Sequence, residues 1–144
     1  MTITFTAIGQ AFAKGSHTAI SRGGRAFLIE GGSYANRKGA KAWARYVEDA
    51  AALVVLTRRL REPISAPVNV AAVFYVRRPA SRKKAAWPDV RPDLDKLVRA
   101  VLDPIVAAGL LKDDSLVVGL DGTQKRYIDA AHPEPGVVVT ITTL

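Results

Sequence analysis

Alternating polar and apolar positions open the chain. Residues 2–8 alternate in this way, which is typical of a strand with one buried face. Residues 68–76 are β-branched, apolar and aromatic, which predicts a buried strand. Residues 115–119, 123–128 and 137–142 have a similar character over shorter runs, so we expect three more strand segments there.

Two segments carry apolar residues at helical spacing. In residues 37–61 the apolar positions recur every three or four residues, which predicts an amphipathic helix with Asn36 as its N-cap. A second helix is expected to begin at Leu94 and to end at Gly109, a residue suited to the left-handed position after a helix. Pro104 falls inside this helix, so we expect a kink or a restart of the helix there.

Glycine and basic residues are frequent in residues 9–36, which predicts a long loop with a short hairpin around Gly23 and Gly24. A loop of this length within a compact domain usually has a function or is disordered. Together, these elements in a chain of 144 residues indicate a single domain over residues 1–144, of the α/β (α+β) class.

The composition excludes several kinds of site. Without cysteine the chain has no disulfide framework, thiolate zinc site or cysteine nucleophile, which fits a reducing cytoplasm. Two histidines cannot build a three-histidine zinc site, and the serines lack the pattern of a nucleophile elbow. We see no signal peptide, and no apolar run approaches the roughly 20 residues of a membrane span. We therefore expect a cytoplasmic protein with no membrane partner.

The charge of the chain points to nucleic acid. A formal net charge of +8 on a small domain suggests a polyanionic partner, although a basic surface that only aids solubility is the alternative. Most basic residues lie between Lys14 and Lys84, whereas the acidic residues between Asp89 and Asp121 are all aspartates. A solvated helix face would more often include Glu, so this concentration of short carboxylates indicates a use for them.

Four of these aspartates form two pairs. Asp93 and Asp95 stand at the start of the second helix, where capping alone accounts for one carboxylate. Asp113 and Asp114 follow the end of that helix in a loop. If the pairs converge, two carboxylates about 4 Å apart repel by about 4 kcal/mol at an effective dielectric of about 20, and they require a cation. Hard oxygen ligands favour Mg²⁺, which would polarise a phosphate and activate water.

Two further residues have open interpretations. Arg99 lies one turn after Asp95 and could stabilise charge on a phosphate or pair with Asp95 or Asp103. Trp87, in a basic loop rich in proline, could stack on a base, but packing is the more common use of such a residue.

The acidic motifs resemble those of a known family. The segment RPDLDKLVRAVLD at 91–103, followed by GLLKDDSLV at 109–117, resembles the RusA family of Holliday junction resolvases, which are found mostly in bacteriophages and prophages. The match covers nearly the whole chain, including the opening strand and the basic glycine-rich loop. The spacing from Asp95 to Asp114 is its specific feature.

The resemblance implies a homodimeric nuclease with a small mixed β-sheet flanked by two main helices, dependent on Mg²⁺ or Mn²⁺. It would resolve four-way DNA junctions by paired symmetric nicks in recombination and repair. Asp93, Asp95 and Asp114 would be the essential catalytic acids that bind the metal, Asp113 an accessory ligand, and Asp103 a group that supports the ligands from behind.

Two positions depart from the family pattern. Lys96 stands where Asn often follows the Asp-x-Asp motif, and Arg99 stands where well-known members have a functional Lys. Arg keeps the positive charge but does not readily donate a proton, so activity is expected while its rate and selectivity stay open.

The resemblance also implies that basic residues hold the phosphates of the junction arms, with an affinity that falls as salt rises. The candidates are Lys14, Arg22, Arg25, Arg37, Lys38, Lys41, Arg77, Arg78, Arg82, Lys83, Lys84 and Lys96. Two alternatives stay open. One is a non-catalytic nucleic-acid-binding protein whose aspartates cap helices, and the other is a metal-dependent nuclease that acts on flaps, forks or RNA.

Overall fold

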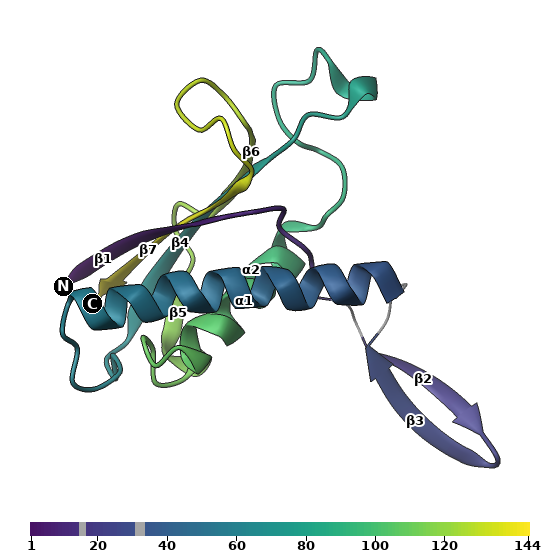
Figure 1. Ribbon diagram of the computed structural model, residues 1–144, viewed down its shortest axis with the longest axis horizontal. Helices are drawn as coiled ribbons and strands as arrows, with labels where there is room; N and C mark the ends of the chain where they lie inside the picture. The colour runs from purple at the N-terminus through teal and green to yellow at the C-terminus, as the bar shows by residue number, and fades with distance from the viewer. Residues whose placement is uncertain (15–16, 31–33) are drawn as a thin grey trace.

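The computed structural model describes residues 1–14, 17–30 and 34–144, and Figure 1 shows the arrangement of its elements. The strands are β1 (Thr2–Ile8), β2 (His17–Arg22), β3 (Arg25–Glu30), β4 (Val68–Val76), β5 (Val117–Gly119), β6 (Gln124–Tyr127) and β7 (Gly136–Thr143). The helices are α1 (Tyr34–Thr57) and α2 (Leu94–Ala107), with short 3₁₀ turns η1 (Ala80–Arg82) and η2 (Asp114–Leu116). No helix within the described ranges is both long enough and apolar enough to cross a membrane.

The main sheet is mixed. β7 lies between β1 and β4 and is antiparallel to both. β5 and β6 are parallel to β4 and share its other edge. β5 pairs where β4 begins, with Val117 opposite Val68, and β6 pairs where β4 ends, with Tyr127 opposite Val76. The segments that follow α2 therefore run along β4 from its beginning to its end.

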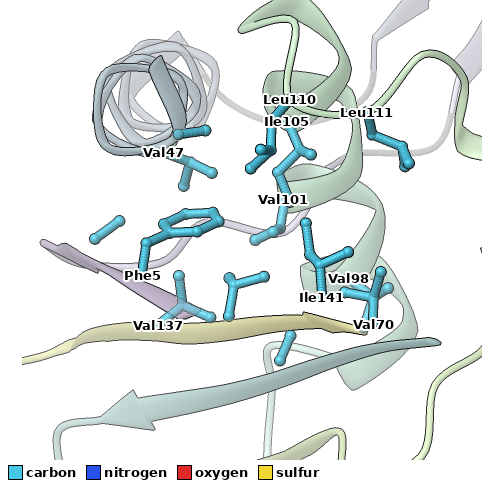
Figure 2. Close-up of a cluster of buried hydrophobic side chains, with 14 of the residues drawn as sticks. Phe5, Val47, Val70, Val98, Val101, Ile105, Leu110, Leu111, Val137 and Ile141 are labelled. Atoms are coloured by element: carbon cyan, nitrogen blue, oxygen red, sulfur yellow. The ribbon is translucent and has the colours of Figure 1, made fainter. Parts of the chain in front are cut away.

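One face of the sheet carries the hydrophobic core. The alternation in β1 turns Ile3, Phe5 and Ala7 inward, and β4 and β7 contribute alternate residues to the same face. Both helices lie over that face (Figure 1), and Figure 2 shows their apolar side chains meeting those of the strands. The predicted fold class, a small α+β domain with a mixed sheet and two main helices, is confirmed.

α2 packs against α1 and the sheet through one apolar stripe. Leu97, Val98, Val101 and Ile105 are buried, as their helical spacing predicted. The helix is continuous through Pro104, so the expected restart is wrong. The proline ring is itself buried in this interface, and its apolar contacts offset the hydrogen bond that its nitrogen cannot make.

The end of α2 is a Schellman motif, as Gly109 predicted. Gly109 has a φ of 75°, the left-handed conformation that suits glycine. Its N–H donates to Val106 O at 3.0 Å, and the N–H of Leu110 donates to Ile105 O at 3.2 Å. This turn directs the chain away from the helix and towards the beginning of β4.

The bounds of α1 differ from the prediction at both ends. The helix begins at Tyr34, so Asn36 lies inside it and is not its N-cap. It ends at Thr57 because Arg59 adopts a left-handed φ of 53° and the N–H of Leu60 donates to Val55 O at 3.0 Å. Leu60 continues the apolar pattern from within this turn, which explains why the periodicity suggested a longer helix.

Two other segments also differ from the sequence prediction. Half of the long loop expected at 9–36 is the hairpin of β2 and β3, with Gly23 and Gly24 in its turn as predicted. Their φ values of 57° and 75° match the type I′ turn, which requires a positive φ at both positions. The strand expected over 115–119 is shorter, because η2 occupies its first part.

We expect Ile105→Ala to lower the free energy of unfolding by about 2–5 kcal/mol, because it leaves a cavity where α2 meets the core. Ile105 is 0% exposed, whereas Val118 is 63% exposed. Val118→Ala is the control and should change stability by less than about 0.5 kcal/mol. Chemical denaturation followed by circular dichroism measures both. A loss at Ile105 no larger than that at Val118 would contradict this packing.

Candidate active site

Asp93 occupies the N-cap position of α2 but does not cap it. Its backbone is extended, with φ −71° and ψ 138°, yet its side chain accepts no hydrogen bond from the helix. The carboxylate is 53% exposed and lies 3.6 Å from Nζ of Lys96, an exposed pairing that contributes little to stability. Helix capping, the structural alternative for this residue, is therefore not its role here.

Asp95 lies in the first turn of α2 and is exposed. Arg99, one turn further along the helix, is exposed as well. Among the residues that the structure describes, Arg99 forms no ion pair with Asp95 or Asp103, because Asp103 pairs with Lys14 instead. The pairing considered for Arg99 from the sequence is therefore not made.

The side chain of Asp113 caps the short turn η2. Its Oδ1 accepts a hydrogen bond from the backbone N–H of Ser115 at 2.8 Å, which caps η2. The hydrogen bond from the Ser115 side chain, and then that from the backbone N–H, hold the pKa of the Asp113 carboxyl below its ordinary value. Asp114, the next residue, is exposed at the start of η2.

The first acidic pair lies near the end of β4. Lys125 pairs with Phe74, close to the last residue of that strand. The Nζ of Lys125 donates to the carbonyl of Pro92 at 2.9 Å, and Pro92 directly precedes Asp93. Asp93 and Asp95 are therefore next to the end of β4.

Asp114 lies near the beginning of β4. It opens η2, and Val117, which follows η2, pairs with Val68. Because a strand rises about 3.3 Å per residue, Val68 and Phe74 lie about 20 Å apart. α2 connects the same two regions, and its 14 residues span about 21 Å. Within one chain the two aspartate pairs therefore lie towards opposite ends of α2 and of β4.

The described residues of one chain do not form a complete set of metal ligands. In residues 1–14, 17–30 and 34–144, no three His, Asp or Glu side chains form a group that could hold a metal ion. The donor type at the start of α2 is nevertheless suitable, because Mg²⁺ takes one or two carboxylates together with water and phosphate oxygens. Metal binding by Asp93, Asp95, Asp113 and Asp114 stays a prediction.

Comparison with known proteins adds the family. The family model described as Endodeoxyribonuclease RusA matches residues 19–142, a span that includes both aspartate pairs. The chain belongs to the RusA family. None of the curated proteins is significantly similar to it in sequence. Membership confirms the predicted family, and it implies Holliday junction nuclease activity and the binding of branched DNA.

Some basic residues of this RusA family member gather between the two helices. Lys14, Arg37 and Lys41 line a hollow of about 180 Å³ together with Asp103. Lys14 forms an ion pair with Asp103, and its backbone N–H donates to Lys96 O at 3.3 Å. Asp103 thus fixes a basic segment against α2, and the structure gives no contact between it and the other aspartates of the motif.

Two arginines of the loop that joins β4 to α2 are engaged in contacts within the protein. Nη1 of Arg78 donates to the carbonyls of Arg82 and Ala85, and its guanidinium lies 4.0 Å from the Tyr127 ring centroid. Arg82 pairs with Asp89 at 3.5 Å. These contacts hold the loop in shape, so Arg78 and Arg82 are less available to DNA than the sequence suggested.

The other basic candidates are on the surface wherever the structure describes their side chains. Arg25, Lys38, Arg77, Lys83 and Lys84 are exposed. The side chain of Arg22 lies outside the described residues. Trp87 is 58% exposed, with the Arg126 guanidinium 6.0 Å from its ring centroid, so it is not part of the core.

Sequence reasoning missed Lys125. It lines a hollow of about 240 Å³ with Arg77, Arg91 and Tyr127, directly before the Asp motif. Its strand alternates, so Lys125 shares a face with the buried Tyr127. A lysine on the inner face of a strand is uncommon, and that pattern was the available signal.

We predict that Ser115→Ala raises the pKa of Asp113 towards its ordinary value, because the substitution removes the hydrogen bond that lowers this pKa most. A depressed pKa stabilises the fold above the unfolded-state pKa, and this contribution disappears as the pH falls through the folded-state pKa. Titration of the Asp113 carboxyl carbon by NMR measures the shift. An unchanged titration in the variant would exclude the Ser115 hydroxyl as the cause.

Proposed function

We propose that this RusA family protein resolves four-way DNA junctions by paired symmetric nicks, as a homodimer that depends on Mg²⁺ or Mn²⁺. The observation that carries the proposal is that the Asp93 side chain does not cap α2. It holds the N-cap position of α2 without capping the helix, beside the exposed Asp95, in a chain of an endodeoxyribonuclease family. We also propose that it is a bacteriophage protein that acts in DNA recombination and repair in the bacterial cytoplasm.

The separation of the acids supports the proposed homodimer. Within one chain the first pair of aspartates lies at the start of α2 and the second follows its end, and the 14 residues of this helix span about 21 Å. A three-carboxylate site therefore requires Asp114 from a second subunit, with Asp113 beside it. A two-fold dimer would contain two such sites, and two equivalent sites suit the two opposed cuts that a near-symmetric junction needs.

The proposed chemistry divides between the ion and the side chains. When bound by Asp93, Asp95 and Asp114, Mg²⁺ would polarise the scissile phosphate and lower the pKa of an attacking water. Arg99, which lies beside the first pair and has no ion-pair partner among the described residues, stabilises negative charge on the phosphate. A guanidinium does not readily donate a proton, so we do not assign the protonation of the leaving group to Arg99.

We predict that Asp95→Asn abolishes cleavage of a four-way junction in Mg²⁺ while the variant still binds the junction. Asn keeps the size of the side chain but loses the charge that holds a cation. Cleavage is measured on denaturing gels and binding by electrophoretic mobility without divalent ions. A flap, a fork, a linear duplex and RNA are run in parallel. Faster cutting of any of these than of the junction would redirect the substrate assignment.

Mixing two inactive variants tests the shared site. If each site takes Asp95 from one chain and Asp114 from the other, a heterodimer of Asp95→Asn with Asp114→Asn contains one intact site. The mixture should then nick the junction, although without paired cuts. If each site lies within one chain, both sites of the heterodimer are damaged. No recovery of nicking would therefore rule out the shared arrangement.

We predict that Lys83→Ala together with Lys84→Ala weakens junction binding and lowers the salt dependence of affinity. Both lysines are exposed in the loop before α2, and each phosphate contact adds about 0.9 to the slope of log K against log salt. Arg58→Ala with Arg61→Ala, which removes two exposed charges beyond the end of α1, is the control. Equal slopes for the two double variants would place the DNA elsewhere.

A further inference from the structure

The chain just before α2 is held by a side chain from strand β6. Lys125 Nζ donates to Val90 O at 2.8 Å and to Pro92 O at 2.9 Å. These carbonyls stand on either side of Arg91, and the second belongs to the residue directly before Asp93. Two short, charge-assisted bonds from one ammonium group restrain the backbone more than a single neutral bond does.

The strand that carries Lys125 is firmly anchored. β6 pairs with β4 in parallel, with Lys125 opposite Phe74, which is fully buried. Just before the strand, the Thr123 hydroxyl donates to Val70 O at 3.2 Å and accepts from the N–H of Ala72 at 3.1 Å. The ammonium group is therefore fixed relative to the central strand of the sheet.

The helix start lacks the restraint that its N-cap residue normally provides. Asp93 makes no capping hydrogen bond, so its side chain does not hold the first turn of α2. Its carbonyl does accept the first helical bond, from the N–H of Leu97 at 3.1 Å. Lys125 holds the chain on the other side of Asp93 and supplies a restraint that does not use the Asp93 carboxylate, whose one ion pair among the described residues is the exposed contact with Lys96.

We propose that Lys125 is a positioning residue for Asp93: by holding the two carbonyls before it, Lys125 sets the direction from which this carboxylate meets a cation and a DNA phosphate. The inference rests on the proposed function, in which Asp93 is part of the active site. Lys125 acts through the backbone and not on the substrate, so its removal affects turnover and metal affinity more than DNA affinity.

The test compares Lys125→Met with Lys125→Arg. We expect the methionine variant to lose about 10–100-fold in kcat for junction cleavage and in Mn²⁺ affinity, the range found when support behind a metal ligand is removed. Its KM for the junction should remain within about threefold, because Lys125 acts through the backbone and not on the substrate. Lys125→Arg, which keeps the charge and several donors, should recover part of both losses. Mn²⁺ binding is measured by electron paramagnetic resonance, independently of cleavage.

Arg126→Met is the matched control. Arg126 is the next residue on β6, is exposed and points to the other face of the strand, so its loss should leave kcat and Mn²⁺ affinity unchanged. A Lys125→Met protein that cuts and binds Mn²⁺ like wild type would overturn the inference. So would equal losses in both variants, because a general effect on the strand would then explain them. Failure of wild type to cut would instead refute the proposed function.

A measurement on the wild-type protein does not depend on whether a variant folds. An ammonium group held by two carbonyls exchanges its protons slowly with water, so Lys125 should give an observable NH₃⁺ signal by NMR at neutral pH. Exchange as fast as that of the exposed Lys84 would show that the two hydrogen bonds are not kept in solution, and would overturn the inference.

Discussion

The burial of one face of α2 determines where each aspartate of the motif lies. Five residues of this helix are buried between α1 and the sheet, which fixes both its direction and its position along β4. The start of the helix then lies near the end of β4, and Gly109 turns the chain back towards the beginning of that strand. The length of this helix separates its start, where Asp93 lies, from its end, after which Asp114 follows.

The positive charge of the protein serves two purposes that the net charge alone does not separate. Arg78 and Arg82 bind carbonyls and an acid within their own loop, and Lys14 pairs with Asp103 across to α2. Arg78 and Arg82 order the loop on which Lys83 and Lys84 stand. A polyanion would then meet a surface whose shape is already set, which reduces the ordering that binding requires.

The sequence predicted those elements in which the buried residues recur at regular spacing. β1 and β4 match their predicted bounds, and α2 begins where Asp93 and the apolar stripe placed it. The errors arose where tertiary contacts override local signals. Pro104 is accommodated within α2 because its ring is buried, and Leu60 continues the pattern of α1 from inside a turn. The Asp motif was visible as a pattern, but the distance between its two halves depends on the direction of α2, which no local pattern encodes.

If Asp93 binds a cation as proposed, Lys125 explains how the start of the helix leaves this carboxylate available. An aspartate at an N-cap normally accepts a hydrogen bond from the first turn, which orders the helix and occupies the side chain. A carboxylate that must bind a cation cannot serve both purposes with the same oxygen atoms, so the order has to come from another group. The two hydrogen bonds from Lys125 supply it through the backbone before Asp93, where no side-chain oxygen is used. Because their acceptors are main-chain carbonyls, no side chain at position 90 or 92 takes part in these bonds. The sequence around the acidic motif therefore contains no trace of the lysine that holds it.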